Sequence, residues 1–172
     1  MDSWTAEIEF ERLSLLARFA KKALLNPLAN RLPAAWWKKW LGGGNSDMAE
    51  ANWRNPGGWR SMVISYEGNP EKTWDRLLVK GGTIPMALRN RRKLGGRLIA
   101  HLIDQGEHEP VHLLCLGAGP GMITADALSR AGRHAHATLV DLSNDAFEFG
   151  RRNAAEMGLR DRMTFIQGDV RD

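Results

Sequence analysis

The segment from Val111 to Gly121, VHLLCLGAGPG, constrains the fold of this chain more than any other stretch. Its apolar run ends in three glycines at every second position, Gly117, Gly119 and Gly121. A short apolar run bounded by glycine predicts a strand buried on both faces of a parallel sheet. The pattern after Gly121 favours a helix, so we expect a strand-to-helix turn at which the backbone can closely approach an anionic ligand.

Strand and helix signals alternate after this turn. We expect a helix to about residue 131, a strand over 137–140 that ends at Asp141, a helix over about 144–157 and a strand over 163–167. The alternation predicts right-handed βαβ units and an α/β, Rossmann-like, three-layer αβα fold. Before the first strand, a helix should begin at Thr83 and cover the sheet with an apolar stripe. The stripe consists of Leu94, Leu98, Ile99, Leu102 and Ile103.

Three domains or regions are predicted from the changes in pattern along the chain. Residues 1–45 should form a helical N-terminal extension, and residues 83–172 the N-terminal half of the α/β domain. Residues 46–82 carry many turn signals and are predicted to be an irregular linking region.

Two local elements are expected in the part that precedes Thr83. An amphipathic helix is predicted over 4–25 and should end near Asn26-Pro27, because proline breaks a continuing helix. One short strand is predicted at Ser61–Tyr66.

Composition narrows the class of protein. The single cysteine, Cys115, excludes an intramolecular disulfide and a cysteine-cluster metal site. No apolar run approaches the ~18 residues of a spanning helix, and we expect a cytoplasmic protein without a metal. The net charge of +4 comes from local clusters of Lys and Arg, which we interpret as solvated helix faces. A nucleic-acid partner is therefore not expected.

We predict that residues 4–40 form a surface that contacts a membrane or another protein. The stretch Trp36-Trp37-Lys38-Lys39-Trp40 combines indoles with lysines, as peripheral membrane segments do. The alternatives are that these tryptophans pack on their own domain or on a protein partner.

Asp141 lies 20 residues beyond Gly121, at the predicted carboxyl end of the second strand. In a doubly wound sheet this position is next to the first turn, where a carboxylate can accept hydrogen bonds from a ribose diol. The pair predicts a cofactor that contains a nucleoside. The alternative is that Asp141 is a helix-capping or turn carboxylate.

The glycine spacing distinguishes between nucleoside cofactors. Dinucleotide-binding turns favour G-x-G-x-x-G, whereas Met122 occupies the sixth position here. The pattern G-x-G-x-G suits a ligand without pyrophosphate. A flavin- or nicotinamide-dependent oxidoreductase remains an alternative.

Three motifs resemble those of class I S-adenosylmethionine (SAM)-dependent methyltransferases. They are LLCLGAGPG, LVDLSNDAFEFGRRNAAEMGL and MTFIQGDV, in the family's order, and the resemblance covers about residues 94–172. It implies SAM as the cofactor and methyl transfer to an unknown acceptor. It also implies that Asp141 binds the ribose hydroxyls and that Asp169 accepts a hydrogen bond from the adenine amino group. The methionine part would be lined by Gly117, Ala118, Gly119 and Gly121, and the adenine by Leu142 and Val170.

The sequence departs from the family pattern in two ways. Cys115 stands two residues before the first glycine, where the family usually has an acidic residue, and we expect a small buried residue there. The chain also stops at Asp172, just after the third strand. We therefore expect a fragment of a methyltransferase whose first strand is an open apolar edge, available for association.

The catalytic residues stay unassigned. All five histidines precede the sheet or lie away from the carboxyl ends of its strands, so we expect structural or surface roles for them. We expect no methyl transfer by the 172-residue chain alone. The alternative function is a non-catalytic binding or membrane-associated module, or a truncated remnant.

Overall fold

The structure is a computed structural model that describes Thr5 and residues 8–171. Contacts divide the chain into two compact units. We call Phe10–Asn90 the helical unit, and the described residues outside this range the sheet unit. The predicted boundaries at residues 45 and 82 stay predictions, because compact contacts do not show which segments fold independently.

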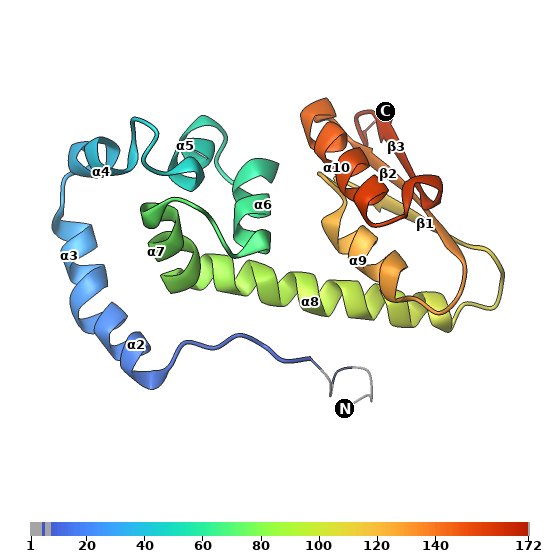
Figure 1. The fold of residues 1–172 in the computed structure, drawn as a ribbon, viewed down its shortest axis with the longest axis horizontal. Helices are drawn as coiled ribbons and strands as arrows, with labels where there is room; N and C mark the ends of the chain where they lie inside the picture. The colour runs from blue at the N-terminus through green and yellow to red at the C-terminus, as the bar shows by residue number, and fades with distance from the viewer. Residues whose placement is uncertain (1–4, 6–7, 172) are drawn as a thin grey trace. The chain divides into compact units, whose positions relative to one another are not determined.

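The elements follow one another along the chain as drawn in Figure 1. Those of the helical unit are α2 (Leu15–Ala20), the π-helical η1 (Lys21–Leu25), α3 (Asn26–Arg31), α4 (Ala34–Leu41), α5 (Asp47–Arg54), α6 (Trp59–Glu67) and α7 (Thr73–Gly81). Helix α8 (Thr83–Asp104) contributes residues to both units. The sheet unit continues with β1 (Val111–Leu116), α9 (Met122–Arg130), β2 (Ala135–Asp141), α10 (Asn144–Glu156), the 3-10 helix η2 (Arg160–Arg162) and β3 (Met163–Gln167).

The helical unit corrects two predictions about residues 46–82. This region is not irregular, because it contains α5, α6 and α7. The strand predicted at Ser61–Tyr66 is wrong, because these residues lie in α6. A short apolar run does not distinguish a strand from a buried helix by its periodicity alone. Gly68, in the left-handed conformation with φ of 71°, ends the helix.

The first helix differs from its prediction at both ends. Residues 8–14 are not helical, and Ser14 caps α2 by accepting a hydrogen bond from the Ala17 backbone N–H at 3.2 Å. Residues 4, 6 and 7 of the predicted helix lie outside the described residues. The helix also does not end at Asn26-Pro27, because η1 leads directly into α3, which contains both residues.

A buried carboxylate links two helices of this unit. Asp75 of α7 is only 1% exposed. It accepts hydrogen bonds from Ser46 Oγ at 2.5 Å, from Asp47 N at 2.9 Å and from Met48 N at 3.3 Å. These donors form the N-terminus of α5, so the carboxylate satisfies backbone groups that the helix leaves unpaired.

The basic cluster at the start of α8 is not simply a solvated face. Arg89 donates from Nε to both carboxylate oxygens of Glu11, at 2.8 and 3.0 Å. It also donates to the carbonyl oxygens of Ser65 and Val79. The side chain is 13% exposed, so this arginine connects four segments of the helical unit.

The sheet unit confirms the predicted alternation of strands and helices. Its strands are parallel, in the order β1-β2-β3, with Leu113 opposite Ala137 and Leu139 opposite Phe165. Ser143 caps α10 by accepting a hydrogen bond from the Ala146 N–H at 3.2 Å. The arrangement is a Rossmann-like α/β fold.

One face of this sheet is covered, and the other is exposed. Ile103 of α8, Leu128 of α9 and Phe147 of α10 are fully buried in one core on the same face. On the opposite face Leu114 and Leu116 are 67% and 59% exposed. The prediction that the first strand is buried on both faces is therefore wrong for the described residues, which supply one helix layer.

Helix α8 is continuous through Gly95-Gly96. A Cβ added to Gly96 would lie 3.1 Å from Asp126 Cβ, so the missing side chain lets α8 and α9 pack closely. Of the predicted stripe, Ile99 and Ile103 contact the core. Its other members face solvent, with exposures of 38% for Leu94, 38% for Leu98 and 55% for Leu102.

Candidate cofactor-binding site

The glycine turn joins β1 to α9 through three left-handed residues. Gly117, Gly119 and Gly121 have φ values of 62°, 53° and 69°, a conformation that favours glycine. A Cβ added to Gly117 would meet no atom within 4 Å, whereas one on Gly121 would lie 2.3 Å from Leu139 Cδ2. Gly117 thus borders open space, and Gly121 is needed for packing against β2.

Asp141 lies next to this turn, as its position in the sequence predicts. Its Oδ2 accepts a hydrogen bond from Gly119 N at 2.7 Å, and its Oδ1 accepts one from Ser143 N at 2.9 Å. The adjacent Ala118 N donates to the Val140 carbonyl at 3.2 Å. The carboxylate therefore connects the turn after β1 with the turn after β2. Its role toward a cofactor stays a prediction.

The turn after β3 places Asp169 beside a cation. Arg171 donates from Nη2 to Asp169 Oδ2 at 2.5 Å and from Nε to Oδ1 at 3.0 Å. The side-chain hydrogen bond with Arg171, followed by one from the Arg171 backbone N–H, lowers the pKa of Asp169. The carboxylate predicted to accept from adenine is thus already engaged by its neighbour.

Two exposed apolar side chains follow the strand ends. Leu142, after β2, is 64% exposed, and Val170, after β3, is 54% exposed. Gln167 Nε2 donates to the Leu142 carbonyl at 3.2 Å and so links the two segments. Their predicted contact with an adenine ring stays a prediction.

Cys115 does not face the turn as a ligand group. Its Sγ lies 3.4 Å from Oγ1 of Thr124, in the first turn of α9, and the residue packs against the core. Sequence reasoning did not identify Thr124 as this partner. It also did not identify Gly150 of α10, at which a Cβ would lie 2.6 Å from the Pro120 carbonyl oxygen. An isolated glycine within a helical pattern is the signal for such a close approach.

Two of the histidines lie on neighbouring strands of the sheet. The rings of His112 and His136 are 6.3 Å apart, and His136 Nε2 lies 2.9 Å from Thr164 Oγ1. The described residues contain no group of His, Cys, Asp and Glu side chains that could hold a metal ion. None of their helices combines the length and apolarity needed to span a bilayer.

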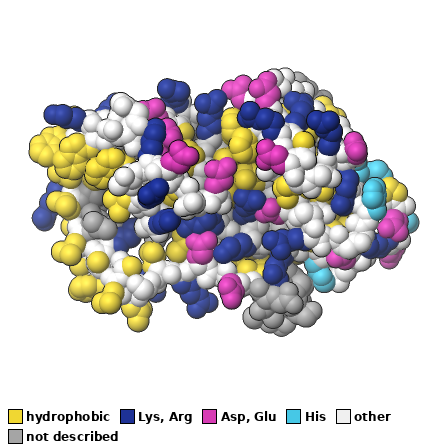
Figure 2. All heavy atoms as spheres, viewed as in Figure 1, with side chains coloured by type: hydrophobic (Ala, Val, Ile, Leu, Met, Phe, Trp, Pro, Cys, Tyr) yellow, Lys and Arg dark blue, Asp and Glu magenta, His cyan; other side chains and the backbone are white. Residues whose placement is uncertain are grey.

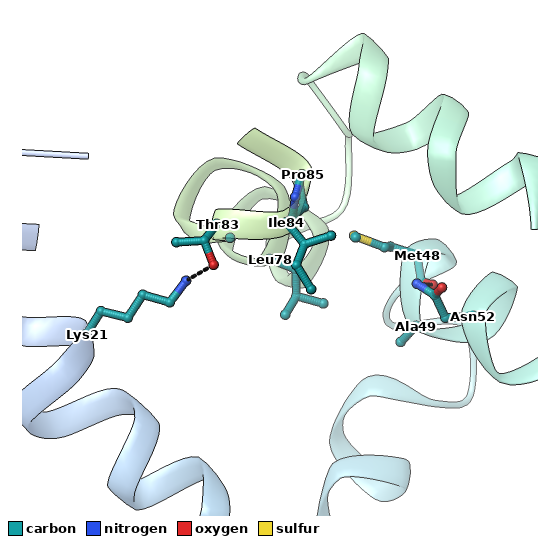
Figure 3. A pocket seen from close by; sticks show the side chains of 9 residues that line it. Lys21, Met48, Ala49, Asn52, Leu78, Thr83, Ile84 and Pro85 are labelled. Atoms are coloured by element: carbon teal, nitrogen blue, oxygen red, sulfur yellow. Dashed lines mark hydrogen bonds between the residues drawn. The ribbon is translucent and has the colours of Figure 1, made fainter. Parts of the chain in front are cut away.

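A cavity of about 440 Å³ lies within the helical unit (Figure 3). Met48, Leu78, Ile84 and Pro85 supply much of its apolar lining, and Lys21 lies at its border. The described lining residues carry no carboxylate, imidazole or thiol, and its apolar lining suits an apolar group.

The three parallel strands and the glycine turn after β1 are features of a Rossmann-like unit. Residues 113–172 match the family model described as a methyltransferase domain. This match confirms the resemblance to class I SAM-dependent methyltransferases that the three motifs predicted. The family match favours the methyltransferase over the oxidoreductase alternative.

Curated relatives are similar over the same part of the chain. The ubiquinone/menaquinone biosynthesis C-methyltransferase UbiE of Bradyrhizobium sp. is 37% identical over 61 residues, which are 36% of this chain and 24% of that protein. The UbiE of Rhodopseudomonas palustris strain TIE-1 is 32% identical over 73 residues, which are 42% of this chain and 29% of that protein. The ribosomal protein uL3 glutamine methyltransferase of Bordetella pertussis is 37% identical over 81 residues, and the match covers 42% of this chain and 26% of that protein. The chain thus spans about a quarter of the length of these relatives.

Two solved structures are also similar in part. YjhP from Escherichia coli is 23% identical, with a TM-score of 0.37 over 45% of this chain and 30% of that chain. The MccD protein is 22% identical, with a TM-score of 0.37 over 44% of this chain and 33% of that chain.

Proposed function

We propose that the sheet unit binds SAM at the carboxyl ends of its strands. The bound SAM would donate its methyl group to an acceptor that is not identified. One observation carries the proposal: the carboxylate of Asp141 lies 2.7 Å from the backbone N of Gly119. The acidic residue and the glycine turn, 20 or more positions apart in the family motifs, are thus held together in the fold. When bound, SAM supplies a methyl group on a sulfonium centre.

The residues at the turn fit such a cofactor. Gly117 leaves open space where any other residue would place a Cβ, which gives the methionine part access to the backbone. Asp141 would accept from the ribose hydroxyls with the lone pairs that Gly119 and Ser143 do not use. Leu142 and Val170 would cover the adenine ring.

Cys115 is the residue that fits least. A neutral thiol does not offer the charge that an acidic residue gives to the ammonium group of the cofactor. We therefore expect weaker binding of the amino-acid part than in relatives that carry the acid.

The acceptor is not assigned. The relatives named above act on a quinone precursor carbon and on a glutamine of a ribosomal protein, and their identity to this chain is similar. Similarity over this segment therefore follows the shared cofactor and does not select an acceptor.

The test is calorimetric titration of the chain with S-adenosylhomocysteine. Wild-type protein should release measurable heat, and Asp141→Asn should weaken binding by about 10- to 100-fold, because hydrogen bonds to a charged group contribute about 1.5–3 kcal/mol. Glu148→Gln is the matched control, since this carboxylate lies on the exposed side of α10.

Thermal melts followed by circular dichroism separate binding from folding. A melt typical of folded protein together with no heat at millimolar ligand would overturn the cofactor assignment. Equal affinities of wild type and Asp141→Asn would show that the ribose is bound elsewhere.

A further inference from the structure

The first helices of the helical unit expose large apolar side chains to solvent. Leu15 is 81% exposed, Phe19 73%, Leu24 67%, Leu28 58% and Trp36 52%. Single exposed leucines are ordinary, but a contiguous set marks a contact surface. We call α2, η1, α3 and α4 with these side chains the N-terminal surface.

The helical geometry keeps four of these side chains on one side. Leu15, Phe19, Leu24 and Leu28 follow one another at steps of four, five and four residues. The five-residue step spans the π-helical segment η1, whose wider turn is closed by i→i+5 hydrogen bonds. The π-helical turn therefore continues an apolar side that a regular helix would interrupt.

The segment that forms this surface carries charge of one sign. Residues 12–46 contain no Asp or Glu, although the chain has 20 acidic residues. The same stretch contains seven cations, Arg12, Arg18, Lys21, Lys22, Arg31, Lys38 and Lys39. The whole chain carries +4, so the remainder carries a net charge of −3. Figure 2 shows hydrophobic and basic side chains together where Figure 1 draws α2, α3 and α4.

Helix α4 adds tryptophans to the surface. Its Leu41 is buried, and Trp40 stacks on Trp74 with ring centroids 6.4 Å apart, which anchors the helix. Trp36 and the lysines Lys38 and Lys39 face solvent. An indole beside ammonium groups suits the boundary between headgroups and acyl chains, where one end of the ring is wet.

The exposed apolar side chains are not needed to hold the helix in place. Lys21 Nζ donates to the Gly81 carbonyl at 3.1 Å and to Thr83 Oγ1 at 3.3 Å, which fixes η1 to the start of α8 (Figure 3). The cavity described above lies beside this contact. Polar substitutions on the outer side should therefore leave the unit folded.

We propose that the N-terminal surface binds an anionic phospholipid bilayer as a peripheral contact. Apolar side chains would enter the headgroup region, while the cations contact lipid phosphates. A segment without acidic residues matches a uniformly negative bilayer better than a protein partner, whose interface carries both signs of charge to set its register. The proposal does not depend on the methyltransferase function.

Vesicle flotation tests the proposal with the full 172-residue chain. The chain should float with vesicles of phosphatidylcholine that contain about one-third phosphatidylglycerol, and much less with phosphatidylcholine alone. Added salt should weaken the binding, because screening shortens the reach of the cations. A chain that stays in the lower fraction with both compositions would overturn the proposal in favour of a protein partner.

Paired variants separate the two contributions. Lys38→Ala/Lys39→Ala should lower the partition coefficient by about 30-fold, since each cation near an anionic surface contributes roughly fivefold. Phe19→Ser/Leu24→Ser should lower it by at least about tenfold through lost apolar burial. The controls are Arg130→Ala/Arg152→Ala and Leu98→Ser/Leu102→Ser, which change exposed residues of the sheet unit. Equal losses in test and control variants would refute a specific surface.

Discussion

At the scale of single residues, two glycines show that a left-handed backbone and close packing are separate requirements. Gly121 adopts φ of 69° and would place a Cβ 2.3 Å from Leu139 Cδ2. Gly158, after α10, adopts φ of 70° but would place a Cβ in open space. The two positions therefore share the backbone requirement and differ in packing.

Alanine at these positions should separate the two costs. Gly158→Ala should lower the free energy of unfolding by about 1–2 kcal/mol, the cost of a left-handed residue with a side chain. Gly121→Ala should lower it by about 1–3 kcal/mol more, because the methyl group overpacks the core. Urea denaturation of both variants measures the difference, and equal losses would contradict the close contact with Leu139.

Asp169 shows how a neighbouring positive charge favours the ionised form of a carboxylate. Arg171 lowers the pKa of Asp169, so the ionised form is favoured in the folded chain. The ion pair contributes to the free energy of unfolding at pH values above the unfolded pKa of about 3.9. This contribution is lost as the pH falls through the lower pKa of the folded state.

Replacement of the arginine should reverse this shift. In Arg171→Ala the pKa of Asp169 should rise toward its ordinary value, as measured by carbon NMR of the side-chain carboxyl during a pH titration. Arg160→Ala removes an exposed arginine elsewhere and should leave the pKa unchanged. An unaltered titration in Arg171→Ala would show that the pair does not form in solution.

At the scale of elements, side chains distant in sequence fix the helix ends. The N-terminus of α5 depends on Asp75, which lies 29 positions beyond the cap residue Ser46. This carboxylate accepts from three donors at a buried site, so its removal leaves them unsatisfied.

Asp75→Ala should therefore destabilise the helical unit by about 2–4 kcal/mol. The measurement is urea denaturation followed by helical circular dichroism. Asp161→Ala, at an exposed aspartate of η2, should change the midpoint little, with an effect within about 0.5 kcal/mol. A similar small effect at Asp75 would mean that water replaces its contacts.

At the scale of the whole molecule, cofactor binding and membrane binding are assigned to different units. The family match covers residues 113–172, and the N-terminal surface lies within Phe10–Asn90. Substitutions in the two units share no contacting residues, so their effects on cofactor binding and on membrane binding should be independent. Phe19→Ser/Leu24→Ser should keep the wild-type affinity for S-adenosylhomocysteine, and Asp141→Asn should keep wild-type flotation. A loss of both readouts in either variant would contradict this division.

The exposed face of the sheet predicts a further property of the chain. Leu114 and Leu116 lie on the uncovered face of β1, and β1 is an edge strand among the described residues. Apolar edges favour pairing with another chain, so we expect self-association. Sedimentation velocity should show larger species for the wild type than for Leu114→Ser/Leu116→Ser. Unchanged sedimentation would place association elsewhere.

The sequence by itself determined the order of the strands and helices after Val111, the glycine turn and the place of Asp141 beside it. These features follow from local backbone preferences and from the short, right-handed connections between parallel strands. The family motifs lie in this part of the chain.

Only the tertiary structure decided which side of each element is covered. The helical state of Ser61–Tyr66, the exposed face of β1 and the pairing of Arg89 with Glu11 all depend on residues distant in sequence. Burial is a property of what packs against a residue, and local pattern does not specify the packing partner. For the same reason, an amphipathic pattern in the first helices became a defined surface only when the structure left Leu15, Phe19 and Leu24 exposed.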